Sequence, residues 1–134
     1  MTSLEKFTLK WNDFQDNISS SFSNLRDNTN LSDVTLISED GQYMEAHKII
    51  LSASSPFFMN ILNTSKHPNP LIYLKGFKAK NLQSILDFMY HGVAEIYQEN
   101  LDGFLAVAEE LQLRGLTGDK GEEHKNKVEK NTRN

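Results

Sequence analysis

Apolar and polar residues alternate at the start of the chain, in Phe7-Thr8-Leu9-Lys10-Trp11. A period of two is typical of a strand with one buried face. Directly afterwards the period changes to that of an amphipathic helix, with apolar residues at Phe14, Ile18, Phe22 and Leu25. We therefore expect a strand over 7–11 that is followed at once by a helix.

Further along, short apolar runs alternate with helical stripes. Strands are expected at 34–37, 42–46 and 71–74, and Asp40-Gly41 is a hairpin-turn signal between the first two. The remaining expected elements are helices at 47–53, 55–62, 79–89 and 101–111 and a short extended piece at 93–97. Ser55-Pro56 is a helix-start signal, with Ser as cap and Pro at the first position, and Gly92 is expected to end the helix before it. This pattern predicts an α+β domain, a small sheet flanked by a cluster of helices.

The strand at 7–11 is unusual because the next element along the chain is a helix. A lone strand cannot satisfy its own backbone N–H and C=O groups, so it must pair with a distant strand or with another chain. The pattern alone leaves both arrangements open.

Length, composition and charge limit the classes of function that the chain can have. A chain of 134 residues suits one domain, and the absence of cysteine excludes disulfides and Cys-based zinc sites within it. The net charge is −4, and 1–116 carries nine Lys and Arg against fourteen Asp and Glu. Direct nucleic-acid binding by this segment is not expected, because phosphate contacts need a basic patch.

The two ends are expected to be flexible. The tail 117–134 holds one sizeable apolar residue, Val128, so it reads as a disordered linker or tail, and 1–6 reads as a flexible N-terminus. The domain itself is expected at 7–116.

Neither a signal peptide nor an apolar run of about 18 residues is present, which points to the cytosol or nucleus.

Few residues of the sequence suggest a catalytic, cofactor-binding or metal-binding site. His47 lies in a segment rich in Ile and Leu, where a hydrogen-bonded structural role is the simplest interpretation, and the other histidines have no metal spacing. The glycines are isolated and form no phosphate-binding loop. We therefore expect no catalytic residues, no cofactor and no metal.

Four motifs in order resemble the BTB/POZ domain family, and the opening Phe7–Phe14 is similar to the tramtrack group of arthropod BTB transcription regulators. The motifs lie at 31–36, 46–58, 88–92 and 108–116. One departure occurs at Gly92-Val93-Ala94-Glu95, where the family often has Gly-Glu-Val.

The resemblance implies a homodimer whose N-terminal strand is exchanged between subunits, with possible growth to higher oligomers. It implies a protein-interaction module of a nuclear transcription regulator, with other tramtrack-group BTB domains and corepressor or chromatin proteins as partners. The dimer interface implied by the resemblance consists of Phe7, Leu9, Trp11, Phe14, Ile18, Phe22, Ala94 and Ile96.

Asp33 and Lys48 are a second group of candidate site residues. The resemblance implies that these opposite charges meet at the floor of a groove between subunits, where a buried charge is tolerated only when it is paired. Two unrelated surface charges are the alternative, and Asp33 alone could cap a turn.

A BTB substrate adaptor for a cullin-based ubiquitin ligase is the rival interpretation. Adaptors usually carry an apolar-x-Glu motif on the helix after the Ser-Pro-Phe-Phe position, and 59–66 contains no Glu. An ion-channel tetramerisation domain fits less well, because the Trp11-Asn12 opening is closer to the tramtrack group.

Overall fold

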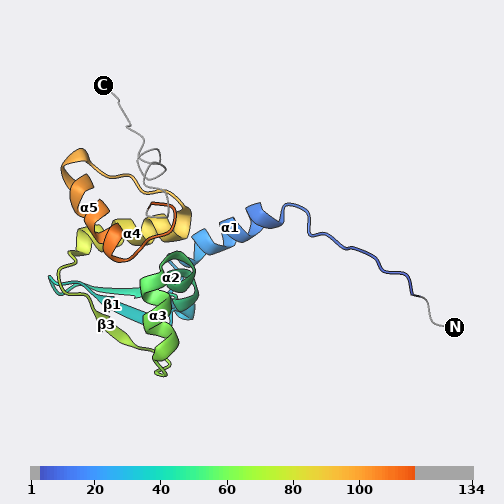
Figure 1. The fold of residues 1–134 in the computed structure, drawn as a ribbon, viewed down its shortest axis with the longest axis horizontal. Coiled ribbons are helices and arrows are strands. Elements are labelled where there is room, and N and C mark those ends of the chain that lie inside the picture. The colour runs from blue at the N-terminus through green and yellow to red at the C-terminus, as the bar shows by residue number, and fades with distance from the viewer. Residues whose placement is uncertain (1–3, 117–134) are drawn as a thin grey trace.

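The computed structural model describes residues 4–116. Within them five α-helices, one 3₁₀ helix and three strands follow one another along the chain (Figure 1). Their bounds are α1 (Phe14–Leu25), η1 (Thr29–Leu31), β1 (Val34–Ile37), β2 (Tyr43–Ala46), α2 (Lys48–Ser54), α3 (Pro56–Thr64), β3 (Leu71–Tyr73), α4 (Ala79–His91) and α5 (Gln98–Glu110). The tail predicted at 117–134 lies outside the described residues.

The three strands form a mixed sheet in the order β2-β1-β3. β1 and β2 are antiparallel and joined by the expected turn, in which Gly41 takes a φ of 83° that favours glycine. β1 and β3 are parallel, and the chain between them forms α2 and α3. A parallel pair needs a long crossover of this kind, so the helix pair and the mixed topology belong together.

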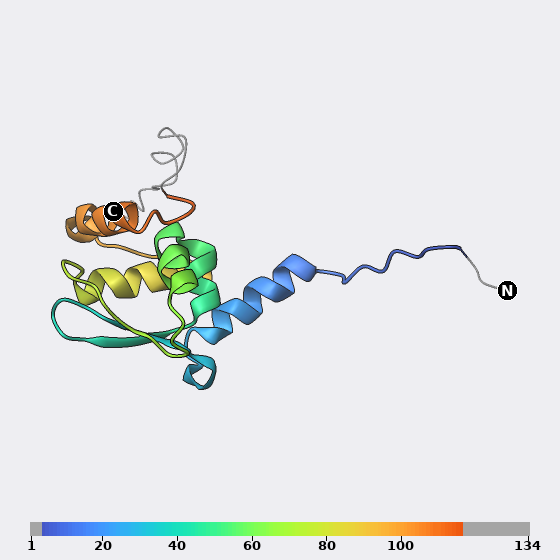
Figure 2. The ribbon, with the colours of Figure 1, turned by 60° about the horizontal axis from the view of Figure 1, so that its bottom comes forward.

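The sheet has one covered face and one open face. Val34, Leu36, Met44 and Ala46 are buried and point toward the helices. Figure 2 shows α2, α4 and α5 on the same side of the sheet. No helix of residues 4–116 covers the other face, as a period of two allows.

The core lies between the sheet and the helices. Its most buried large side chains come from different elements: Leu36, Leu51, Phe58, Leu86 and Leu111. The last turn, which carries buried Leu113 and Leu116, closes the domain at its C-terminal end. Truncating any such side chain to Ala would cost roughly 2–5 kcal/mol.

Helix boundaries follow their sequence signals. The Ser55 hydroxyl accepts the Phe58 N–H at 3.2 Å and Pro56 is the first residue of α3, as the sequence predicts. Gly92 adopts the left-handed conformation and ends α4. The first helix begins at Phe14, with Asp13 at its N-cap position.

The N-terminal part protrudes from this body. In both Figure 1 and Figure 2, α1 leaves the body and continues into an extended segment that reaches away from it. Residues 4–11 are extended but belong to no strand of the described chain. An intramolecular strand at 7–11, one of the two arrangements that the pattern left open, is therefore absent from the described residues.

Candidate self-association surface

The apolar residues of the N-terminal segment are in solvent. Phe7 is 82% exposed, Leu9 91%, Trp11 58% and Phe14 49%. Trp11 and Phe14 contact each other edge to face, with ring centroids 5.0 Å apart. Scattered exposed apolar residues are ordinary, but a contiguous run of large ones marks an interaction site.

The backbone of this segment is unsatisfied as well. Across residues 4–116, no backbone N–H of 7–11 donates to another backbone carbonyl. Such a row of donors and acceptors is a ready template for pairing with another strand. The segment thus offers both an apolar face and free backbone groups.

The helix α1 divides into an anchored half and a free half. Near its end, Phe22 and Leu25 pack on the core, and the Ser23 hydroxyl donates to the carbonyl of Tyr90 at 3.2 Å. Its first turns contact little: Phe14 is exposed and Ile18 is half-buried. Of the expected helix face, Phe14 and Ile18 remain accessible, whereas Phe22 is largely used within the chain.

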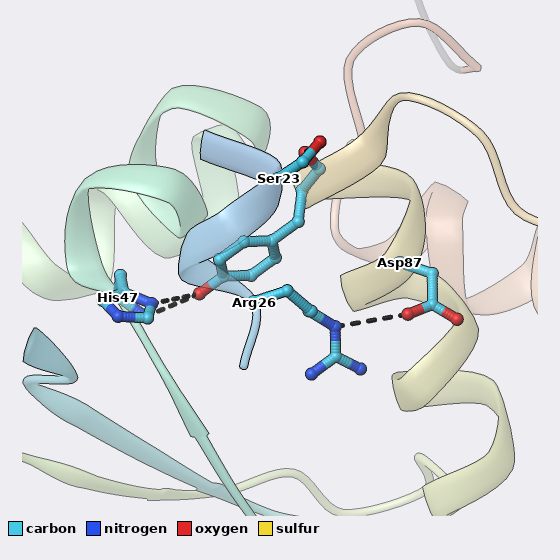
Figure 3. A network of polar contacts seen from close by, with 5 residues as sticks. Ser23, Arg26, His47 and Asp87 are labelled. Carbon is cyan, nitrogen blue, oxygen red and sulfur yellow. Dashed lines mark hydrogen bonds and ion pairs between the residues drawn. The ribbon is translucent and has the colours of Figure 1, made fainter. Parts of the chain in front are cut away.

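A polar network holds the anchored half (Figure 3). Arg26 forms an ion pair with Asp87 of α4, with 3.2 Å between Nε and Oδ1, and its guanidinium carbon lies 5.8 Å from the centre of the Tyr90 ring. The Tyr90 hydroxyl accepts the backbone N–H of His47 at 2.9 Å and lies 2.6 Å from His47 Nδ1. Through Tyr90 the network joins α1, α4 and the start of α2.

The proton positions in the network follow from its chemistry. His47 Nε2 is 3.1 Å from the carbonyl oxygen of Asn28, which can only accept. Nε2 therefore carries the ring proton, and Nδ1 accepts from the Tyr90 hydroxyl. Burial raises the pKa of Tyr90 to about 12, because a phenolate would lose its hydration there. The structural role expected for His47 agrees with this geometry.

The segment 93–97 belongs to no strand of the described chain, and of its residues Tyr97 has an extended backbone. Its side chains alternate: Ala94 and Ile96 are half-buried, and Ile96 packs on the core, whereas Val93 and Tyr97 are exposed. Ala94 and Ile96 are thus oriented toward their own chain more than expected. Their neighbours Val93 and Tyr97 are the side chains that a partner would meet.

The expected ion pair of Asp33 and Lys48 is not formed within the described chain. The Asp33 carboxylate accepts the backbone N–H of Lys48 at 2.7 Å, while the Lys48 ammonium donates to the carbonyl of His67 at 3.2 Å. Asp33 therefore satisfies a free N–H at the first turn of α2. Within the described chain Asp33 thus caps α2, and its pairing with Lys48 in a groove between subunits stays a prediction.

A shallow cleft of about 500 Å³ lies between β2, α4 and the segment 26–29 that follows α1. Its polar lining includes Arg26, Asp27, Glu45, Asp87 and His91. A polar, open cleft suits hydrogen bonds with a protein segment better than it suits an apolar ligand. Among residues 4–116, no cluster of His, Asp or Glu side chains is placed to hold a metal ion.

Sequence reasoning did not find the role of Tyr90, Arg26 and Asp87. The tyrosine belongs to the Phe88–Gly92 motif, and a tyrosine on an otherwise apolar helix face was the available signal, since a buried hydroxyl needs partners. The partners come from elements far apart in the sequence and could not be inferred from spacing.

The sequence profile of the BTB/POZ domain matches residues 22–127. The chain belongs to the BTB/POZ domain family. This confirms the resemblance drawn from the motifs at 31–36, 46–58, 88–92 and 108–116, and it makes the chain a member of a family of protein-interaction domains.

Two fruit-fly relatives (Drosophila melanogaster) show how BTB/POZ domains of this type occur. The longitudinals lacking protein-like protein is 47% identical over 116 residues, which are 87% of this chain and 91% of that protein. The alpha isoform of protein tramtrack is 42% identical over 113 residues, which are 84% of this chain but 14% of that protein. The chain thus corresponds to nearly the whole of one relative and to a small part of the other.

The solved structures agree on the fold. The BTB domain of human gigaxonin covers 82% of this chain at 21% identity, with a TM-score of 0.67. The α+β class and the small sheet with its helix cluster are thereby confirmed. Among residues 4–116, no helix has both the length and the apolar character needed to cross a bilayer.

Proposed function

We propose that this BTB/POZ domain forms a homodimer by exchanging its N-terminal segment. The residues 7–11 of each copy add to the partner's chain beside 93–97, and Phe14 and Ile18 pack against their symmetry mates. The unpaired, apolar segment is the observation that carries the proposal, because it combines free backbone groups with large exposed side chains.

The exchange would give a neighbour to two segments, 93–97 and the first turns of α1. Among residues 4–116 the stretch 93–97 belongs to no strand, and the first turns of α1 protrude from the body without a helix beside them (Figures 1 and 2). Obligate interfaces bury about 2,000 Å² or more, and they resemble a domain core cut in half. Exposed Phe7, Leu9 and Trp11, together with the first turns of α1, supply apolar surface of that kind.

We further propose that the dimer serves a nuclear transcription regulator and recruits corepressor or chromatin proteins. The similarity to protein tramtrack and to the broad-complex core protein supports this role. Because the domain is 14% and 17% of those two proteins, any DNA-binding segment would lie elsewhere in a protein of their kind. Related BTB domains of the same group are candidate partners, since backbone pairing at 7–11 is insensitive to side-chain identity.

Size-exclusion chromatography with light scattering tests the dimer. We expect a mass of at least twice that of the 15.3 kDa chain at micromolar concentration. A monomer across the whole concentration range would overturn the exchanged dimer. Mixing two differently tagged preparations and co-purifying them would then measure whether subunits exchange.

The alternative is a substrate adaptor for a cullin-based ubiquitin ligase. The helix α3 exposes Met59, Asn60 and Asn63 but carries no acidic residue, which disfavours the adaptor. A pull-down with purified cullin discriminates the two functions. Retention of cullin at low micromolar concentration would favour the adaptor, and its absence with an intact dimer favours the transcription module.

A further inference from the structure

The outer face of the sheet carries two rows of side chains that run across its strands. The strand register places Tyr43, Ile37 and Tyr73 in one row and Glu45, Thr35 and Leu71 in the next. These positions alternate with the buried ones, so all six side chains point away from the core. The helices α2, α4 and α5 lie on the opposite side of the sheet (Figure 2).

The first of these rows has an exposed aromatic ring at each end. Tyr43 is 68% exposed and Tyr73 56%, while Ile37 between them is half-buried. Within residues 4–116 the hydroxyls of Tyr43 and Tyr73 have no hydrogen-bond partner. Each ring therefore offers a partner both apolar area and a free donor.

The distance between the two tyrosines matches the repeat of a particular ligand conformation. Neighbouring strands lie about 4.7–4.9 Å apart, so the backbones at Tyr43 on β2 and Tyr73 on β3, with β1 between them, are about 9.5 Å apart. A polyproline II helix has three residues per turn and rises about 3.1 Å per residue, so every third residue returns to the same side after about 9.3 Å. A proline-rich segment that crosses the strands would place prolines i and i+3 over the two rings.

The backbone chemistry of such a segment fits the same row. Proline has no N–H, and a polyproline II helix makes no internal hydrogen bonds, so its carbonyl oxygens need donors from the surface that binds it. The hydroxyls of Tyr43 and Tyr73 are donors of this kind. An added β-strand would instead pair with backbone groups along a sheet edge, which the face of the sheet does not present.

Charge indicates what flanks the prolines. The two rows contain one charged side chain, Glu45 on β2, whose carboxylate accepts the hydroxyl of Ser32 through one of its two oxygens. An Arg or Lys beside the prolines would meet Glu45 at the β2 end of the rows, and this attraction would fix the direction in which the segment lies. The net charge of −4 favours a basic segment as well. A nucleic acid finds no cation among these six side chains.

We propose that the outer sheet face binds a proline-rich segment of another protein, in the polyproline II conformation and with a basic residue next to the prolines. Such a segment is already extended before it binds and loses little conformational freedom, so two aromatic contacts and a few hydrogen bonds suffice for measurable affinity. The inference rests on the proposed recruitment of other proteins, but it uses none of the residues 7–18 or 93–97 of the proposed dimer.

An NMR titration of the isotope-labelled protein tests the face. The probe is a peptide of two arginines followed by ten prolines, which presents the i, i+3 spacing in every register. We expect the amide signals of Ile37, Tyr43 and Tyr73 to shift and to saturate with a Kd below about 1 mM. Tyr43→Ala and Tyr73→Ala should each weaken binding at least about tenfold. Met59→Ala, which truncates an exposed side chain of α3, is the matched control and should bind as the wild type does.

Two further comparisons separate conformation from charge. A peptide of two arginines followed by alternating glycine and serine carries the same charge without the polyproline II conformation, and it should leave the three amide signals unchanged. Glu45→Gln, which can still accept the Ser32 hydroxyl, should weaken binding of the arginine-bearing probe. The same variant should bind ten prolines without arginine as the wild type does, because Glu45 is expected to contact the basic residue alone.

Each contrary result overturns the inference in a different way. No response of the three amides to the proline probe shows that the face does not bind it. Equal binding of the glycine-serine peptide shows that charge alone is responsible. Tighter binding of an amphipathic helical peptide with the same two arginines makes the face a docking site for a helix. A dimer that does not respond overturns this inference alone, and a monomer that binds the probe overturns the proposed dimer alone.

Discussion

Tyr90 is the residue on which the attachment of α1 depends. Its hydroxyl bonds to both the backbone and the ring of His47, its carbonyl accepts the Ser23 hydroxyl, and its ring lies beside the Arg26 guanidinium. These contacts join three helices at a buried point. A buried polar group whose bonds are all made stabilises one arrangement of its neighbours over the rest.

Replacing Tyr90 by Phe should lower the free energy of unfolding by about 1–3 kcal/mol, because the His47 backbone N–H and Nδ1 lose their partner in a buried site. Urea denaturation followed by circular dichroism measures this loss. Tyr43→Phe, which removes a hydroxyl from a largely exposed ring outside the proposed dimer interface, is the matched control and should be close to neutral. Equal effects of the two changes would contradict the importance of the network.

The pKa of Tyr90, raised to about 12 by burial, predicts a loss of stability in alkali. In the unfolded chain a tyrosine ionises near its ordinary value of about 10. Above that pH the unfolded state releases a proton that the folded state retains, so stability is present below about pH 10 and falls as pH rises toward 12. The free energy of unfolding of the wild type should therefore fall more steeply over this interval than that of Tyr90→Phe. Parallel curves would be inconsistent with the raised pKa.

Asp33 and Lys48 provide a test of capping against ion pairing. Asp33→Ala should lower the free energy of unfolding by about 1–2 kcal/mol, since it removes the acceptor of a helix N-terminal N–H. Lys48→Met should cost less than about 1 kcal/mol, because the ammonium contacts a carbonyl near the surface. In a double-mutant cycle the two effects should add to within about 0.5 kcal/mol. A larger coupling would indicate the ion pair after all, formed across subunits.

The same two residues show where sequence reasoning reaches its limit. The motif placed Asp33 and Lys48 near each other, and they are near each other. The sequence could not tell that the carboxylate would meet the backbone of Lys48 rather than its ammonium. That depends on where α2 begins, and helix ends are uncertain by a residue or two from the sequence alone.

At the scale of elements, α1 is a helix of twelve residues, none of them buried. Isolated helices of this length are marginal in water, so tertiary contacts must supply the stability. The ion pair of Arg26 and the packing of Leu25 secure its last turn. Its first turn would be secured by the partner chain.

The double change Trp11→Ala/Phe14→Ala should prevent assembly and yield aggregated or unfolded protein rather than a clean monomer. A large side chain that becomes fully buried in the dimer contributes about 3–5 kcal/mol. Light scattering and thermal melting measure the outcome. Leu31→Ala, which truncates an exposed apolar residue of η1, is the control and should leave mass and melting temperature nearly unchanged. A well-folded monomer of the double variant would argue against an obligate dimer.

Most elements were predictable because local signals and burial agree. Alternating Val34 to Ile37, the Asp40-Gly41 turn, the Ser55-Pro56 start and the Gly92 stop all lie where the sequence places them. The strand predicted at 7–11 stays a prediction, because these residues belong to no strand of the described chain and the proposed partner strand lies in a second copy. The order β2-β1-β3 was also not predictable from the pattern, since β3 is aligned by a crossover and not by a turn.

At the scale of the whole molecule, net charge distinguishes proteins from nucleic acid as expected binding partners. A net charge of −4 without a basic patch predicts that the domain alone binds random duplex DNA more weakly than about 100 µM at physiological salt. Fluorescence anisotropy with labelled duplex tests this, with a basic DNA-binding protein as the positive control. Micromolar binding that weakens steeply with salt would contradict this prediction, because it would require the folded domain to bring Lys and Arg side chains together in a basic patch.

In a single copy Leu4, Phe7 and Leu9 are exposed to solvent, and in the proposed dimer a second chain would cover Phe7 and Leu9. Extended, exposed peptide is what proteases cut and chaperones hold, and both act continuously on such chains in cells. We expect a solitary subunit to be short-lived and an assembled one to persist. The amount of the protein in a cell would then follow the supply of subunits it can join, so surplus copies would be removed without a dedicated degradation signal.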